Sequence, residues 1–513
     1  MKNMEFVEKI EKEQFQFVQR EGQIHDQKLE TKARGYFADA MIRFRKNKSS
    51  VIAAWVLLFL VLYAIFAPIL SPYTIEDTDG IYYNAPAYVP AIADMNLGIM
   101  DGSRELPSQT EQSMNAWRGI AEETGYNPVV SIVDTVETEV KIRGQIVKRM
   151  TYTIRTNRYF EPGVVYRTMS YEEFANVQQW QNETGIQVIY PYVDASDING
   201  ITDQPNVWYK CDKKGAAILD KNGNLQPVYS THADKAGAEY NSLRIEGDPG
   251  NYVYSFAVSG AVKVRVCYYN YYQYKFGMEP TYIFGTDVVG RDLFGAIGQG
   301  ARFSIIFAIL VSAINLTLGA IYGAIQGYYG GMIDMILDRI SDILSGVPFI
   351  VVATLFQFHL VLTGKVSSLT AFLFAFVLTG WIGMAALTRK QFYRFKSQEF
   401  VMAARTLGAS DRRLMFKHIF PNGLGTMITS CALVIPGVIG SETSLTYLGI
   451  VDLNSMVGCT LGTLLSSGQA SMTTAPHAML WPSVYLALLM ICFNLFGNGL
   501  RDAFNPSMRG VED

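Results

Sequence analysis

The sequence of 513 residues has few charges for its length. Only 17% of the residues are charged and the formal net charge is −3, so bulk charge does not indicate a nucleic-acid partner. Four long stretches contain no Asp, Glu, Lys or Arg at all: 304–329, 343–364, 366–388 and 453–500. About 20 apolar residues suffice to cross a bilayer as a helix. The missing charges therefore exclude an ordinary soluble protein and indicate membrane spans.

Motifs for catalysis and nucleotide binding are also missing. The sequence has no G-x-x-x-x-G-K-[ST] loop for phosphates, no nucleophile elbow and no paired-cysteine metal site. Asp194, Asp197, Asn199 and Asp203 weakly resemble a calcium loop, but an Asx-rich turn fits their spacing better. We therefore expect no catalytic residue, no metal site and no cofactor in this chain.

Ionisable side chains are scarce within the apolar runs, where Glu442, His359 and His418 are found. A charge at the bilayer centre costs roughly 3 kcal/mol or more, and ion-driven transporters keep such groups for function. No ion relay is visible here. We expect Glu442 to lie at the membrane interface rather than on a transport path, and the histidines to be packing or interface residues rather than ligands.

The apolar runs predict an all-α polytopic membrane protein. Six spans are expected, at about 51–70, 304–328, 345–363, 367–388, 425–448 and 478–498. Gly319, Gly323 and Gly327 form a G-x-x-x-G pattern in the second span, which allows close packing of helices. Residues 332–342 carry charges on a helical period, which predicts a helix at the membrane edge.

A segment of different character, 71–282, separates the first two spans. It is rich in Tyr, contains segments of alternating polarity, and has turn signals at Asn199-Gly200 and Asn222-Gly223. These features predict an inserted, mostly β domain outside the bilayer. Cys211 and Cys267 lie within it, and a disulfide between them stays open because the sequence does not show whether they are close.

Basic residues indicate the orientation of the spans. The loop at 389–417 has eight Lys and Arg residues, whereas the loop at 449–477 has none. We therefore expect a plasma-membrane protein with a cytoplasmic N-terminal helical segment (1–50), a cytoplasmic tail (501–513) and an extracellular insert (71–282).

The best-patterned polar stretch is 399–422. Good helix formers continue to Leu407, Gly408 interrupts them, and Ser410 with Asp411 provides a new N-cap for a second helix that we expect to end at Pro421. The small side chains of Ala403 and Ala404 would let another surface approach closely. The pattern predicts a docking element made of a helix, a glycine corner and a second helix.

The spacing of Ala403-Ala404, Gly408 and Ile419-Phe420-Pro421 is similar to the EAA loop in membrane subunits of binding-protein-dependent ABC importers. The wider stretch, together with the Gly-Thr-Asp and Gly-Arg-Asp segments at 285–292, resembles the C-type permease subunit of dipeptide, oligopeptide and nickel importers. Met402 stands where the motif has its glutamate, and its consequence stays open. The resemblance does not extend to the large insert.

This resemblance implies a type I ABC importer permease with its core at 283–500 and no ATPase site of its own, so we do not expect an enzyme. It implies a second homologous permease subunit, two cytoplasmic ATPases that bind ATP and Mg, and an extracellular solute-binding protein that delivers a peptide. The size and expected outside location of the insert, and not the resemblance, suggest a docking or scaffold domain for the binding protein. The substrate path is not predicted. The expected ATPase-coupling residues within 399–421 are Glu399, Ala403, Ala404, Arg405, Gly408, Arg412 and Pro421.

Two alternatives remain at this point. One is an importer for nickel or another small solute, since close relatives of the resembled family carry such substrates. The other is a membrane-anchored extracellular receptor or adhesion protein, for which six spans and a structured cytoplasmic loop are more than an anchor needs.

Overall fold

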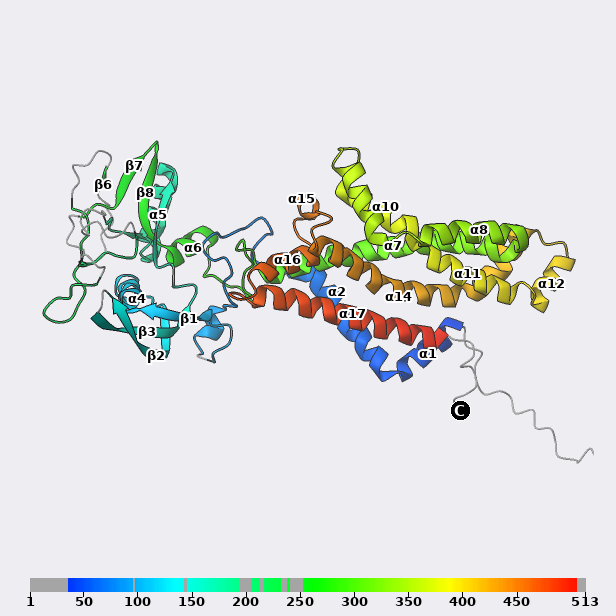
Figure 1. Ribbon diagram of the computed structural model, residues 1–513, viewed down its shortest axis with the longest axis horizontal. Helices are drawn as coiled ribbons and strands as arrows, with labels where there is room; N and C mark the ends of the chain where they lie inside the picture. Colours follow the sequence, from blue (N-terminus) through cyan, green and yellow to red (C-terminus); the bar gives the residue numbers. More distant parts are fainter. Residues whose placement is uncertain are drawn as a thin grey trace, which may run out of the picture.

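The computed structural model describes residues 36–95, 97–142, 145–193, 204–212, 216–231, 238–239 and 252–504. Figure 1 shows a long bundle of helices with a group of strands and short helices at one end. The expectations for residues 1–35, for the Asx-rich loop at 194–203 and for residues 505–513 lie outside the described residues.

Five helices in the described part are long and apolar enough to cross a membrane. A sixth candidate is a pair of helices bent by 73° at a short break. The six expected spans therefore correspond to five helices and this bent pair, which replaces the straight span expected at 345–363. The candidates are α2 (Lys48–Leu70), α7 (Leu293–Tyr329), α8 (Gly331–Ser345) with α9 (Phe349–Phe356) and η2 (Gln357–Val361), α10 (Ser368–Gly380) with α11 (Ile382–Phe395), α13 (Asp411–Arg413) through η3 (Leu414–Ile419) to α14 (Phe420–Tyr447), and α17 (His477–Phe504).

The G-x-x-x-G prediction is confirmed by the contact between α7 and α11. A Cβ on Gly319 would lie 2.6 Å from the Trp381 carbonyl oxygen, and one on Gly327 would lie 2.7 Å from the Cβ of Phe392. Real Cβ atoms do not approach so closely, so only glycine allows the two backbones to meet at these positions.

Shorter helices complete the bundle. The first of them, α1 (Tyr36–Lys46), packs on α17 through Phe44 and Phe496, whose ring centroids lie 5.6 Å apart. The C-terminal end of α14 is connected to the N-terminal end of α17 through α15 (Asn454–Val457) and α16 (Leu461–Ala470). The segment predicted as a membrane-edge helix is α8, the first half of the bent pair. It packs along α7, where the Tyr322 hydroxyl donates to the Leu337 carbonyl oxygen over 2.7 Å.

The insert contains two antiparallel sheets, as its alternating segments predict. One has the order β1-β3-β2, and the other has the order β4-β8-β7-β6 with β5 paired to β8. The strands are β1 (Ser103–Thr110), β2 (Val129–Ile142), β3 (Gln145–Asn157), β4 (Val164–Met169), β5 (Ile189–Tyr190), β6 (Ala238–Glu239), β7 (Ser255–Val258) and β8 (Ala261–Cys267).

Helices in the insert were not predicted. Besides a single turn at α3 (Pro90–Ala93), they are α4 (Glu111–Thr124), α5 (Tyr171–Thr184) and α6 (Tyr268–Phe276). Thr110 and Ser170 cap α4 and α5, and left-handed glycines at 125 and 185 end them. These capping signals are present in the sequence, so the insert is better described as mixed α and β.

The insert is joined to the bundle through a short antiparallel ladder and an aromatic core. The backbone N–H groups of Tyr88 and Tyr282 each donate to the carbonyl oxygen of the other residue, over 2.8 Å and 2.7 Å. Tyr73 stacks on Tyr282 with ring centroids 4.7 Å apart. Cys211 and Cys267 are both free and belong to different buried clusters, so they do not form the disulfide left open by the sequence.

Candidate functional site

The polar stretch 399–422 lies at the end of the helical bundle opposite the insert (Figure 1). It forms α12 (Glu399–Thr406), a corner at Gly408 with φ of +84°, and α13 followed by η3. The prediction of two helices around a glycine corner is confirmed, because a φ of this sign favours glycine. We call the segment 399–421 the coupling loop, after the role predicted for it.

The predicted end of the second helix at Pro421 is wrong. Pro421 lies in the first turn of α14, which runs on from η3 and continues to Tyr447. Pro421 has no N–H group to donate to the preceding turn, and it lies where the π-helical turn η3 passes into α14. The coupling loop therefore passes into α14 without a separate connection.

One face of the coupling loop packs into the bundle. Val401, Leu414 and Ile419 are fully buried against side chains of α7, α11 and α14. Ala404 packs against the same cluster, so it faces the bundle and not a partner surface.

The other face points outward. Ala403, Gly408, Glu399 and Arg412 are exposed, and a Cβ on Gly408 would meet nothing within 4 Å. Leu407 is 88% exposed, which is the highest exposure among the large apolar side chains of the described residues. Sequence reasoning missed Leu407 as a docking residue, although a leucine directly before the corner glycine of a polar loop was the available signal.

A basic hollow of about 480 Å³ lies beside this outward face. Three of its lining residues are Arg412, Arg413 and Lys417, and in the described part of the chain none of them forms a salt bridge. The excess of positive charge suits an acidic surface on a partner. The hollow is lined by Ser410, Arg412, Arg413, Phe416, Lys417 and Pro421.

The predicted coupling residue Arg405 forms a hydrogen bond to another helix of the same chain. Its Nη2 donates to the hydroxyl of Tyr328, the penultimate residue of α7, over 3.2 Å. The same hydroxyl donates to Oδ1 of Asp411 over 2.5 Å. Sequence reasoning did not identify Tyr328 or Asp411, because a tyrosine at the end of a span is commonly an interface residue.

A second polar network ties α8 to α11 near the same end of the bundle. Arg389 lies 2.6 Å from Asp334 and 2.7 Å from Asp338, and the hydroxyl of Tyr393 donates to Asp334 over 2.6 Å. Gln326 of α7 also donates to Asp338. Two of the charges that predicted a membrane-edge helix, Asp334 and Asp338, therefore hold the helices of the bundle together, whereas Arg339 is exposed and pairs with Asp342.

Glu442, for which an interface position is expected, is enclosed by protein. Its side chain is fully buried between α14 and α7, where the Ser304 hydroxyl donates to it over 2.7 Å. Thr443 and Thr446 add longer contacts of 3.3 and 3.4 Å. Hydroxyl donors from α7 and from α14 itself make burial of the carboxyl group tolerable, and the contact from α7 is not revealed by a single sequence.

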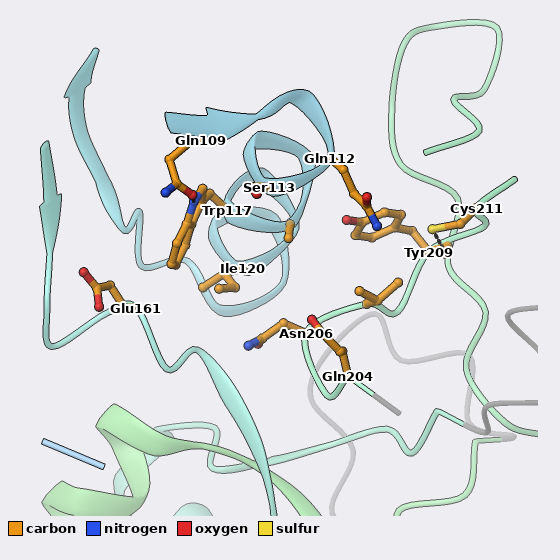
Figure 2. A pocket seen from close by; sticks show the side chains of 12 residues that line it. Gln109, Gln112, Ser113, Trp117, Ile120, Glu161, Gln204, Asn206, Tyr209 and Cys211 are labelled. Carbon is orange, nitrogen blue, oxygen red and sulfur yellow. Dashed lines mark hydrogen bonds between the residues drawn. The ribbon is translucent and has the colours of Figure 1, made fainter. Parts of the chain in front are cut away.

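The insert contains a hollow of about 330 Å³ between α4 and residues 204–211, with Trp117 and Tyr209 on its wall (Figure 2). Its polar groups serve the fold. Glu161 pairs with Arg104, and Asn206 bonds to the backbone of residues 162 and 164. Burial raises the pKa of the Cys211 thiol, which makes it a poor nucleophile.

The fold and the loop define a polytopic membrane protein of the ABC permease class. Residues 316–510 match the family model described as the binding-protein-dependent transport system inner membrane component. Residues 35–87 match the N-terminal TM domain of oligopeptide transport permease C. The chain therefore belongs to the family of inner membrane components of binding-protein-dependent transport systems, and it is a permease subunit of an ABC importer.

Several curated relatives are matched over most of their own length. An oligopeptide transport system permease protein of Bacillus subtilis is 38% identical over 226 residues, which is 44% of this chain and 72% of that protein. One of Haemophilus influenzae is 39% identical over 45% of this chain and 72% of that protein. The dipeptide transport system permease protein of Bacillus subtilis is 34% identical over 44% of this chain and 69% of that protein.

The family models leave residues 88–315 unmatched. The first matched segment ends one residue before Tyr88, which pairs with Tyr282 in the ladder at the base of the insert. The unmatched stretch thus contains the two sheets and the helices α4, α5 and α6, together with the first part of α7.

Proposed function

We propose that this permease subunit imports oligopeptides or dipeptides. The observation that carries the proposal is the match of both family segments, together with relatives named for oligopeptide and dipeptide transport. Those names favour peptides over nickel or another small solute. A receptor or adhesion protein would not need the permease segment at 316–510.

Two partner ATPases would bind ATP and Mg and drive transport from the cytoplasmic side. The exposed face of the coupling loop supports this assignment, since Glu399, Ala403, Gly408 and Arg412 all lie on it. Leu407 is the apolar side chain best placed to enter a groove on an ATPase. Ala404 and Arg405 would act from within the permease, where they hold the loop against the bundle.

The insert would lie outside the cell, between residues 88 and 282, and would help to dock the solute-binding protein. Its position at the end of the bundle opposite the coupling loop supports this orientation (Figure 1). The N-terminal segment and the C-terminal tail would then be cytoplasmic, as the basic loop predicts. A second homologous permease subunit would complete the transport path in the lipid bilayer.

The proposal is tested by purifying the tagged protein in mild detergent and identifying the proteins bound to it by mass spectrometry. We expect two ATPases and a second permease in stoichiometric amounts, and a binding protein that retains peptides. Recovery of the chain without any ATPase would contradict the proposal and would favour the receptor alternative.

A further inference from the structure

A single hydroxyl group joins the last turn of α7 to both helices of the coupling loop. The Tyr328 hydroxyl donates to Asp411 of α13 over 2.5 Å and accepts from Arg405 of α12 over 3.2 Å. The guanidinium carbon of Arg405 also lies 5.8 Å from the centre of the Tyr328 ring. Because a phenol donates one hydrogen bond and accepts others, it can bridge a carboxylate and a guanidinium at once.

The rest of the Tyr328 side chain is nearly buried in the cluster that receives the inner face of the loop. This cluster includes Val401 and Leu414, which lie on the two sides of the Gly408 corner. A Cβ on Gly408 would meet nothing, but Ala409 beside it packs on the same cluster and its N–H donates to the Ala404 carbonyl oxygen over 3.1 Å. The end of α7 therefore adds a contact from outside the loop to both α12 and α13, besides the backbone hydrogen bonds at the corner.

The helix that carries Tyr328 is firmly held in the bundle. Its neighbour Gly327 lies against α11, where a Cβ would come within 2.8 Å of the Arg389 carbonyl oxygen. A displacement of the loop therefore reaches the second span directly, besides the fourth and fifth spans to which the loop is covalently joined.

We propose that Tyr328 is a positioning residue for energy coupling, which holds α12 and α13 in one geometry so that movement of the ATPases is transferred to α7. This inference rests on the proposed function, because it assumes that ATPases dock on the loop. Tyr328 itself contacts neither ATP nor the transported solute. It acts through Arg405 and Asp411.

The test compares Tyr328→Phe with Tyr329→Phe in the complete complex, reconstituted in liposomes. Tyr329 is the matched control because it is the neighbouring tyrosine and its side chain is half exposed. The ring centroids of Tyr328 and Tyr329 lie 5.2 Å apart in an edge-to-face arrangement. Loss of a hydrogen bond to a charged group weakens an interaction by about tenfold or more. We expect Tyr328→Phe to lower the number of peptides imported per ATP hydrolysed by about tenfold, with the same amount of ATPase bound.

Two results would overturn the inference. One is an unchanged ratio of import to hydrolysis. The other is a parallel loss of bound ATPase, import and hydrolysis, because that would indicate a merely structural role. The double variant Tyr328→Phe with Asp411→Asn provides a further check, since residues that act through one contact are not additive. We expect the double variant to import no fewer peptides per ATP hydrolysed than the more impaired of the two single variants. Losses that add up in the double variant would contradict the inference.

A readout without substrate separates this inference from the proposed function. In the purified chain, amide hydrogen exchange in residues 399–413 should rise in Tyr328→Phe and stay unchanged in Tyr329→Phe. That result supports the positioning role even if the wild-type complex fails to import peptides, which would count against the peptide assignment alone. Equal exchange in the two variants would contradict the positioning role.

Discussion

Gly323 of α7 faces the backbone carbonyl of Ala385 in α11 so closely that a Cβ on this glycine would overlap the carbonyl oxygen. The same Cβ would lie 2.8 Å from the Cβ of Thr388. Neither obstacle is the end of a flexible side chain, so a larger residue at 323 forces the two helices apart.

Replacing Gly323 by Ala should therefore destabilise the bundle by about 1–3 kcal/mol, the usual cost of overpacking. The melting temperature of the purified chain in detergent measures this loss. Gly383→Ala is the matched control within α11, because a Cβ there would meet nothing within 4 Å. Equal melting temperatures for the two variants would show that the α7 contact is looser than described.

The insert depends on a buried ion pair between α4 and β8. Arg265 is fully buried, and its Nη2 lies 2.6 Å from Oε2 of Glu123. Removing one partner of a buried pair typically costs about 3–5 kcal/mol. We expect Glu123→Gln to increase amide hydrogen exchange throughout α4 and β8.

Glu122→Gln is the control for this pair, since Glu122 pairs with Arg118 at the surface and such pairs contribute about 0–1 kcal/mol. Its exchange pattern should resemble that of the unchanged protein. If both variants exchanged alike, the buried pair would not be what stabilises the insert.

At Gly408, alanine should be tolerated better than proline. Gly408 has φ of +84°, whereas proline requires about −65°. Gly408→Pro should abolish ATP-driven uptake while membrane insertion stays normal, and Gly408→Ala should cost only about 1–2 kcal/mol of local strain. Uptake assays in membrane vesicles check both, and normal uptake by Gly408→Pro would refute the role of the corner.

Leu407 should contribute directly to ATPase binding. Full burial of a leucine in a partner groove contributes about 1.5–3 kcal/mol. Leu407→Ser should thus lower the affinity for the ATPase by about 10–100-fold, as measured with the purified subunits. Leu448→Ser is the control, since Leu448 is also exposed but follows the other end of α14. Unchanged affinity in Leu407→Ser would remove Leu407 from the docking surface.

The ladder at the base of the insert defines a clean deletion. Tyr88 and Tyr282 are already paired, so residues 89–281 can be replaced by a two-residue turn. The shortened chain should insert and bind ATPases normally, but uptake should fall when the binding protein is scarce. Loss of ATPase binding in this variant would show that the insert supports the bundle itself.

The sequence was most informative where a pattern is local. Apolar runs located the spans, Gly408 located the corner, and the glycines at 319, 323 and 327 indicated a close helix contact, whose partner α11 the sequence did not name. What sequence reasoning missed depends on contacts between distant residues. The burial of Glu442 requires Ser304, and the role of Tyr328 requires Arg405 and Asp411.

The bend in the third span and the position of Pro421 were missed for a different reason. Residues 346–348 separate two helices that only together are long and apolar enough for a span, so hydropathy did not reveal the 73° bend. Proline fits either the end of a helix or its first turn, and only the continuation of η3 into α14 decides between them.

Uptake of a labelled oligopeptide into liposomes containing the purified complex decides whether this chain is a subunit of a peptide importer. We expect uptake that requires ATP, Mg and the solute-binding protein, and that competes with unlabelled peptides but not with nickel. Uptake without ATP, or uptake of nickel alone, would contradict the assignment of this chain as a subunit of an ATP-driven peptide importer.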